Sequence, residues 1–258
     1  MSSQILTLLA WSFSVTTGQV LAQADPLAPT AVHDSAARPT LYLIPGTGAD
    51  ERLFHQLDLS AFDTVNVRLP VAGRKEDMTA YAARVAETYV DTTRPYGVLG
   101  VSLGGMVATE WAASLQPEFV VIVASAKTRR ELPAGYRMAR YVPVYRLVGG
   151  KTMRWFTRLV QPAFEPMEPE QRDLFIDMIY GKDPRFLQRA VGLMVNWRRE
   201  DVPAGVTHVH GESDRTLPLK RAAPDYCVRG EGHMLTYSRP EVVEWALGEA
   251  ARSTGLNP

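Results

Sequence analysis

The sequence predicts an α/β fold, a mostly parallel, doubly wound sheet of about six strands with helices on both faces and a helical insertion. Short apolar runs alternate with helical stretches along the chain. Several of these runs are almost free of polar residues, which is typical of strands covered on both faces. The strands are predicted at residues 41–44, 65–69, 97–101, 119–124, 206–210 and 225–228.

The N-terminal segment, residues 1–24, has the pattern of a signal peptide. Residues 5–20 are largely apolar, and the sequence Leu-Ala-Gln-Ala at 21–24 matches the small-x-small pattern ahead of a cleavage site. Because the segment has no Lys or Arg, a frayed N-terminal helix of a cytoplasmic protein is the alternative. The apolar stretch is too short and too polar for a stable membrane span. We expect a periplasmic or secreted protein, cleaved near Ala24, with residues 25–38 as a linker.

A Gly-x-Ser-x-Gly sequence runs from Gly100 to Gly104, between the predicted strand 97–101 and a predicted helix at 103–115. The two glycines let the flanking chains pass closely, so that a sharp strand-to-helix turn lifts the serine oxygen above the sheet. The positive end of the helix dipole then stabilises negative charge at the same place. Ser102 is therefore the predicted nucleophile, and a glycine-rich turn that only packs against the sheet is the alternative.

A serine hydroxyl needs a histidine base, and in this arrangement the chain order is serine, acid, histidine. His233 lies in a Gly-Glu-Gly-His stretch between the predicted strand 225–228 and a predicted helix at 240–252. Of the other histidines, two precede the serine and two alternate along the strand 206–210, so we interpret the latter two as structural. These four are His33, His55, His208 and His210.

The acid that orients the histidine is expected on the loop after the strand 206–210. Asp214 is the predicted acid, and Glu212 on the same loop is the second candidate. A helix N-cap or a turn aspartate before Pro218 is the structural alternative for Asp214.

With these motifs in this order, residues 39–252 resemble the α/β-hydrolase superfamily. The resemblance rests on residues 43–48 (Leu-Ile-Pro-Gly-Thr-Gly), residues 100–104 (Gly-Val-Ser-Leu-Gly), the sequence His-Gly-x-x-Asp ending at Asp214, and Gly-His ending at His233. It implies an α/β-hydrolase fold with an oxyanion hole formed by the backbone N–H groups of Thr47 and Leu103. Many members have His-Gly where this chain has Pro-Gly at 45–46.

An insertion of about 80 residues separates the strands 119–124 and 206–210, far more than one crossover helix requires. It is predicted to form a helical cap at 127–196, between core segments at 39–126 and 197–254. Helices are predicted at 136–148, 152–160, 169–180 and 184–198. We expect most of its aromatic side chains to pack inside the cap and a few to line a pocket above the serine.

The charge balance is even, with 28 Lys plus Arg and 28 Asp plus Glu, which gives no reason to expect nucleic acid binding. Residues 127–158 nevertheless carry nine basic residues against one acid. A solvated basic face is the favoured interpretation. Attraction of an anionic substrate by Lys127, Arg129 and Arg130, or adhesion of the segment to an anionic membrane surface, are the functional alternatives.

Cys227 is the only cysteine, so neither an intramolecular disulfide nor a thiolate metal site is expected. We interpret it as a small buried hydrophobic residue on a strand.

Together these features predict a serine hydrolase that cleaves a carboxylic ester or thioester through an acyl-enzyme, without metal or organic cofactor. The serine argues against the aspartate nucleophile of related dehalogenases and epoxide hydrolases. Similar hydroxynitrile lyases place a Lys beside the catalytic histidine, where this chain has Met234. Carbon–carbon bond hydrolases, cofactor-free perhydrolases and a non-enzymatic binding protein remain as alternatives. The identity of the substrate and the oligomeric state are left open.

Overall fold

A computed structural model describes residues 38–164 and 167–256. The predicted signal peptide at 1–24 lies outside the described residues, as does all but the last residue of the predicted linker. Among the described residues, no helix is long and apolar enough to cross a membrane.

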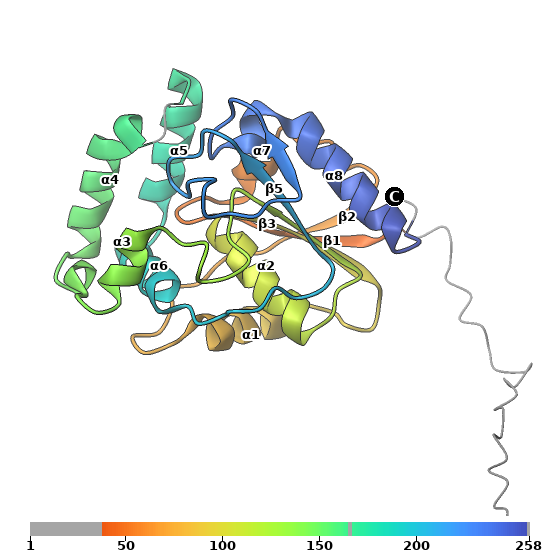
Figure 1. Cartoon of the computed structure of the whole chain (residues 1–258), viewed down its shortest axis with the longest axis horizontal. Coiled ribbons are helices and arrows are strands. Elements are labelled where there is room, and N and C mark those ends of the chain that lie inside the picture. The colour runs from red at the N-terminus through yellow and green to blue at the C-terminus, as the bar shows by residue number, and fades with distance from the viewer. Residues whose placement is uncertain (1–37, 165–166, 257–258) are drawn as a thin grey trace, which may run out of the picture. The chain divides into compact units, whose positions relative to one another are not determined.

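The centre of the fold is a six-stranded sheet in the order β2-β1-β3-β4-β5-β6, in which every neighbouring pair is parallel (Figure 1). This confirms the predicted parallel α/β sheet. The strands are β1 Thr40–Ile44, β2 Asp63–Asn66, β3 Tyr96–Val101, β4 Phe119–Val123, β5 Val206–Gly211 and β6 Tyr226–Val228.

The second strand differs from its prediction at 65–69 because its partner ends early. Leu43 of β1 pairs with Asn66, and the Val67 N–H donates to the Leu43 carbonyl oxygen at 2.9 Å. One residue after Ile44 the chain reaches Pro45, which has no N–H to donate. The remaining residues of the predicted strand therefore continue as a loop.

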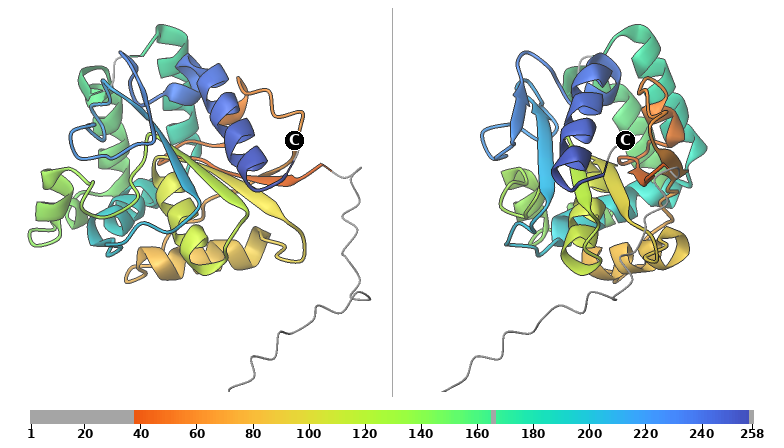
Figure 2. Two further views of the ribbon diagram at one scale, coloured as in Figure 1. Left: turned by 45° about the vertical axis from the view of Figure 1, so that its right-hand side comes forward. Right: turned by 90° about the vertical axis from the view of Figure 1, so that its right-hand side faces the viewer.

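Helices cover both faces of the sheet (Figure 2). Side chains alternate along each strand, so Tyr42 and Ile44 join the core cluster on the side of α1 Met78–Tyr89 and α2 Leu103–Ser114. Leu41 and Leu43 join the opposite cluster, which includes residues of the 3₁₀ helix η1 and of the C-terminal helices. The elements of that side are η1 Glu51–Phe54, α7 Leu235–Ser238 and α8 Pro240–Ser253.

Four helices and a 3₁₀ turn lie between β4 and β5 in the described chain, and we refer to them as the cap. Its elements are α3 Ala134–Ala139, η2 Val144–Arg146, α4 Gly150–Phe164, α5 Pro169–Gly181 and α6 Pro184–Asn196. The prediction of a single helix at 136–148 is wrong. Helix α3 ends at Ala139, and the separate turn η2 begins after Pro143, because proline lacks the N–H that would continue the helix.

A buried carboxylate joins the end of the cap to the core. Glu110 of α2 accepts hydrogen bonds from Trp197 Nε1 at 2.7 Å, Arg199 Nε at 2.8 Å and Thr79 Oγ1 at 2.9 Å. Burial alone would raise the pKa of Glu110, but the bonds from Arg199, Trp197 and Thr79 together lower it. The carboxylate thus stays ionised and links α1, α2 and the chain segment after α6.

Cys227 is exposed, so its interpretation as a buried residue is wrong. It lies on the edge strand β6, where its neighbours Tyr226 and Val228 turn toward the core and leave it on the outward side.

Candidate active site

Ser102 occupies a strained turn between β3 and α2. Its φ of 53° and ψ of −117° lie in a region that residues with a Cβ rarely adopt. The Ser102 N–H donates to the Val123 carbonyl oxygen at 3.0 Å, and the Ser125 hydroxyl donates to the Ser102 carbonyl oxygen at 2.6 Å. These two bonds to β4 and its following residues hold the turn in place.

Two glycines beside Ser102 are needed because backbone atoms pass very close to them. A Cβ at Gly104 would lie 2.1 Å from the Ile44 carbonyl oxygen. A Cβ at Gly100 would lie 2.5 Å from the Gly104 carbonyl oxygen. The Gly-x-Ser-x-Gly spacing therefore reflects contact between the turn, β1 and α2.

His233 and Asp214 form a hydrogen-bonded pair, with His233 Nδ1 2.7 Å from Asp214 Oδ2. The Asp214 side chain is fully buried, and its other oxygen accepts the Leu217 N–H at 2.7 Å. Burial alone would raise the pKa of Asp214, but His233, Leu217 and His210 together lower it. Because an ionised carboxylate only accepts hydrogen bonds, His233 donates through Nδ1, and Nε2 is the nitrogen that can take up a proton.

The Glu212 carboxylate binds the backbone of a neighbouring loop. Its Oε2 accepts the Gly230 N–H at 3.0 Å, a bond that ties two neighbouring loops together. Of the two acids proposed from the sequence, the structure places Asp214 beside the histidine.

Two further histidines stand behind Asp214, and the sequence reasoning treated them only as structural. His210 Nε2 is 2.8 Å from the Leu217 carbonyl oxygen and 3.4 Å from Asp214 Oδ2, while His208 Nε2 is 3.0 Å from His210 Nδ1. Since a carbonyl only accepts, His210 carries its proton on Nε2, and His208 donates to His210 Nδ1. Burial lowers the pKa of both imidazoles and keeps them neutral. The sequence signal for this arrangement was the position of His208 and His210, two residues apart on the strand that leads into the loop of Asp214.

Thr47 lies on the turn after β1 and lines the same cavity as Ser102. Its Oγ1 is buried and has no hydrogen-bond partner among the described residues. The turn packs closely against α5 of the cap, since a Cβ at Gly48 would lie 2.6 Å from Ile179 Cγ1. Gly48 also has a φ of 80°. Only glycine meets both conditions.

Leu103 is the first residue of α2, and its N–H belongs to the group that a helix leaves without an intrahelical acceptor. Its side chain is fully buried. The backbone N–H of Leu103, directly after Ser102, is therefore available as a hydrogen-bond donor.

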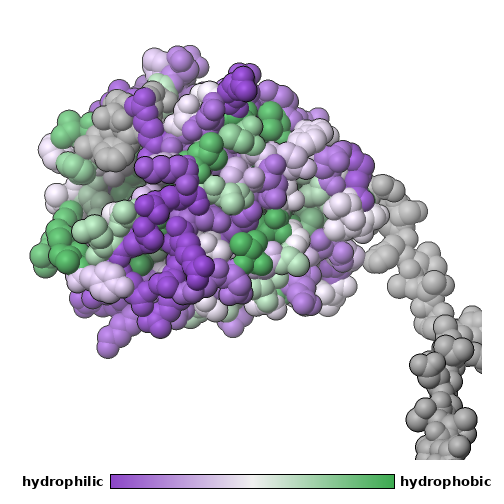
Figure 3. All heavy atoms as spheres, viewed as in Figure 1, coloured by the Kyte–Doolittle hydropathy of each residue, from purple (hydrophilic) through white to green (hydrophobic). Residues whose placement is uncertain are grey.

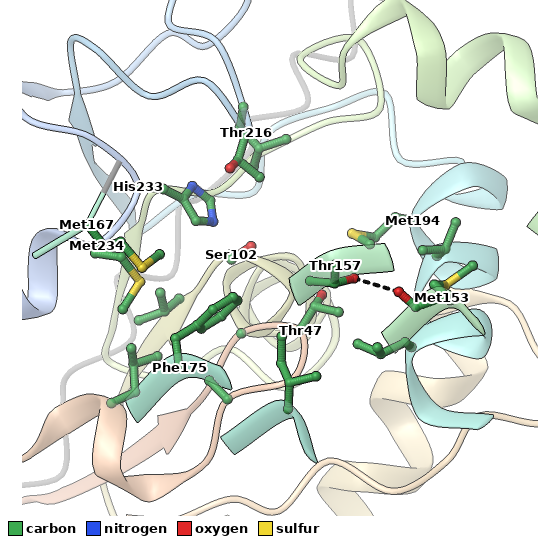
Figure 4. A pocket seen from close by; sticks show the side chains of 18 of the residues that line it. Thr47, Ser102, Met153, Thr157, Met167, Phe175, Met194, Thr216, His233 and Met234 are labelled. Atoms are coloured by element: carbon green, nitrogen blue, oxygen red, sulfur yellow. Dashed lines mark hydrogen bonds between the residues drawn. The ribbon is translucent and has the colours of Figure 1, made fainter. Parts of the chain in front are cut away.

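A cavity of about 270 Å³ lies between the core and the cap, and both Ser102 and His233 project into it (Figure 4). Every helix of the cap contributes to its wall, through apolar side chains and the Thr157 hydroxyl, which donates to the Met153 carbonyl oxygen at 2.9 Å. No Lys, Arg, Asp or Glu lies among its described lining residues. The cap residues that line it are Tyr136, Met153, Thr157, Met167, Phe175, Ile179, Leu187, Val191 and Met194.

The three cations proposed from the sequence to attract an anionic substrate do not line this cavity. Lys127 is buried, with Nζ 3.7 Å from Asp225 Oδ2. Arg129 and Arg130 both pair with Glu200, Arg130 at 2.9 Å. Their arrangement favours the structural interpretation over the attraction of a substrate.

Among the residues that the structure describes, no three His, Cys, Asp or Glu side chains come together in a geometry that could hold a metal ion.

The site combines a strand, a sharp turn at a serine and a helix with an acid–histidine pair at the carboxyl ends of later strands. The profile of the Alpha/beta hydrolase family matches residues 41–245. The chain belongs to the alpha/beta hydrolase family. It is therefore a hydrolase, and the resemblance drawn from its motifs is confirmed. None of the curated proteins compared with this alpha/beta hydrolase matches it.

Solved structures share the fold of this alpha/beta hydrolase at low sequence identity. A thermophilic esterase from Thermogutta terrifontis, with malate bound, is 17% identical with a TM-score of 0.63, covering 84% of this chain and 91% of its own. A hydrolase from Pseudomonas aeruginosa PA01 is 18% identical with a TM-score of 0.60, covering 83% and 89%. An esterase from Exiguobacterium antarcticum is 15% identical with a TM-score of 0.59, covering 84% and 92%.

Proposed function

We propose that the protein is a serine hydrolase that cleaves carboxylic esters or thioesters through an acyl-enzyme, with Ser102 as nucleophile, His233 as base and Asp214 as the acid that orients it. The observation that carries this proposal is the hydrogen-bonded pair of His233 and Asp214, 2.7 Å apart, whose histidine projects into the same cavity as Ser102. A nucleophile, a base and an orienting acid are the three groups this chemistry requires.

In the first half of the reaction, Ser102 Oγ bonds to the carbonyl carbon of the substrate while its proton passes to His233 Nε2. The tetrahedral intermediate then collapses, the bond from carbon to the leaving oxygen or sulfur breaks, and the leaving group takes the proton from His233. In the second half, a water molecule gives its proton to His233 and attacks the acyl carbon. The bond from the acyl carbon to Ser102 Oγ then breaks, the carboxylic acid leaves, and His233 returns the proton to Ser102 Oγ.

The negative charge that develops on the carbonyl oxygen is stabilised by the N–H groups of Thr47 and Leu103 in this proposal. Leu103 suits the role because it begins α2, where the helix dipole is positive. The unpaired hydroxyl of Thr47 is a third donor for the same oxygen.

The lining of the cavity supports an uncharged, apolar acyl or alcohol group in the substrate. A buried charge without a partner is strongly unfavourable, and the described lining offers it no opposite charge. A carbon–carbon bond hydrolase or a perhydrolase would use the same three residues, and no feature of the described cavity favours either.

Labelling with a fluorophosphonate and hydrolysis of p-nitrophenyl esters of graded chain length test this function. The wild-type protein should be labelled at Ser102 and should prefer apolar acyl chains. Ser102→Ala and His233→Ala should each lower kcat at least about 10³-fold, and the double variant should lose little more because the residues act together. Ser253→Ala, on α8, is the control and should behave as wild type. Absence of labelling in the folded wild-type protein would instead indicate a binding protein.

We also propose that residues 1–24 are removed during export. Mass spectrometry of the protein recovered from the periplasm or medium should then find Asp25 at the N-terminus, whereas an intact Met1 in the cytoplasm would contradict export.

A further inference from the structure

The outward side of the cap exposes an unusual amount of apolar surface. Eight of the eleven large hydrophobic side chains exposed in the described chain lie on α3, η2, α4 and the loops between them, with exposed fractions from 53% to 87%. Figure 3 shows hydrophobic residues along the left-hand edge of the molecule, on the side where Figure 1 draws α3 and α4. We call this surface the outer cap face. It comprises Met138, Tyr141, Val142, Val144, Leu147, Trp155, Phe156 and Leu159.

The same segment is strongly basic. Residues 132–164 contain six Lys or Arg and no Asp or Glu. None of the six forms an ion pair with a carboxylate of the described residues, and Arg154 instead lies over the Tyr180 ring at 4.5 Å. The cations are Arg137, Arg140, Arg146, Lys151, Arg154 and Arg158. Residues 132–164 therefore bring apolar and positively charged side chains to this face and contribute no carboxylate to it.

Helix α4 connects this surface with the cavity. Met153 and Thr157 line the cavity, whereas Trp155, Phe156 and Leu159 are exposed. Tyr136 of α3 also lines the cavity, while Met138 of the same helix is exposed. Since both helices face the cavity with one side and solvent with the other, whatever covers the outer cap face also lies next to the cavity.

The charge of the outer cap face decides between two possible occupants. In a symmetric dimer the same patch faces itself, which would bring the six cations of one copy against the six of the other without a counter-charge. A bilayer that carries anionic lipids supplies both partners at once. Its acyl boundary accepts Trp, Phe and Leu side chains, and its phosphate groups accept the flanking Lys and Arg, whose long stems reach the headgroups.

We propose that the outer cap face docks on a membrane surface rich in anionic phospholipids. Docking there brings the bilayer against the helices that wall the cavity, so that apolar esters dissolved in the bilayer are held near the site. This delivery step rests on the proposed esterase function, whereas the docking itself does not.

Sedimentation with vesicles tests the docking. The full chain is mixed with vesicles of phosphatidylcholine alone and with vesicles in which about one third is phosphatidylglycerol. Binding to the anionic vesicles should be at least about tenfold tighter, because their negative surface potential attracts the Lys and Arg side chains of the outer cap face. Added salt should weaken it by screening. Equal binding to both kinds of vesicle, or none to either, would overturn the proposal.

Two variants of the outer cap face separate its parts. Replacing Trp155, Phe156 and Leu159 together by Ser should reduce binding to anionic vesicles at least about tenfold, as should replacing Arg140, Lys151 and Arg158 together by Gln. Each variant carries the same N-terminal segment, so a difference between them reports this face alone. Hydrolysis of a short, water-soluble ester should stay as in wild type, which shows that the variants fold.

The matched control removes the same charge elsewhere. Arg94, Arg229 and Arg252 are exposed on the core and are replaced together by Gln. This variant should bind anionic vesicles within about twofold of wild type, since its charges lie outside the contact. Equal losses in the control and the cap variants would overturn the proposal. So would a wild-type dimer that the Ser variant converts to a monomer, because the face would then be a subunit interface. If no ester is hydrolysed but vesicles are bound, the proposed function fails and the docking stands.

Discussion

His210 Nε2 lies 2.8 Å from the Leu217 carbonyl oxygen and 3.4 Å from Asp214 Oδ2. Leu217 in turn donates its N–H to the other oxygen of Asp214 at 2.7 Å. The loop from Gly211 to Leu217 is thus closed around the carboxylate by a histidine of the preceding strand. The acid that contacts His233 owes its position to a side chain that does not itself reach the cavity.

The buried pair of His208 and His210 should make the protein sensitive to mild acid. Their pKa values lie below 6.5 in the folded state because of burial, whereas the unfolded chain binds protons near that value. The unfolded state therefore holds more protons below about pH 6.5, and the free energy of unfolding falls as the pH decreases further. Asp214, whose pKa is lowered from 3.8, loses its contribution only at more acid pH.

The measurement is urea unfolding between about pH 7.5 and pH 5. His208→Leu should show a shallower dependence of the free energy of unfolding on pH than wild type. His55→Gln, at an exposed position, should keep the wild-type slope. The same slope in all three proteins would show that the buried imidazoles do not account for the acid sensitivity.

Replacing each of the two acids on the loop by its amide should have very different effects on kcat. Asp214→Asn should reduce kcat about 10³- to 10⁴-fold, because the amide can donate to Nδ1 and stabilise the wrong tautomer of His233. Glu212→Gln should reduce it less than about tenfold, since this side chain accepts the Gly230 N–H. Steady-state kinetics with one ester suffice. The opposite ranking would assign the role to Glu212.

The strained backbone of Ser102 should make glycine the more stable inactive substitution. At a φ of 53° and ψ of −117°, Ser102→Gly should exceed Ser102→Ala in free energy of unfolding by about 1 kcal/mol. At the exposed helical position Ala113 in α2, the order reverses, and Ala113→Gly should lose about 1 kcal/mol. Chemical denaturation of all variants is the test. An alanine variant as stable as the glycine variant would mean that the turn relaxes.

Glu110 should be among the most sensitive buried positions outside the cavity. Glu110→Gln leaves Arg199 with the exposed Asp201, 3.6 Å away, as its counter-charge and puts an amide donor among other donors, which should lower the free energy of unfolding by about 3 kcal/mol. Glu118→Gln, exposed before β4, should change it by less than about 0.5 kcal/mol. Since the pKa of Glu110 is lowered, its contribution is present above about pH 4.3 and is lost as the pH falls through the folded value. Similar losses in both variants would deny the carboxylate its role in joining cap and core.

Local sequence determined the sheet and the serine turn, because the forces involved act between neighbours along the chain. Apolar runs predict buried parallel strands, and the glycines around Ser102 permit a turn that other residues would obstruct. The sequence predicts strands best where both faces of the strand are buried, because such a strand consists almost entirely of apolar residues. The sequence signal was weaker for β2 and for the helix predicted at 136–148, where pairing with β1 and the proline at 143 set the ends.

Only the tertiary structure decided which side chains meet. Asp214 and Glu212 are both plausible from the sequence, and packing against β5 and Leu217 places Asp214 beside His233. The same holds for the basic flank: Glu200, far along the chain, pairs with Arg129 and Arg130, while the cations of α3 and α4 meet no acid among the described residues. Distances between residues remote in sequence depend on how helices pack, and a hydropathy pattern does not contain them.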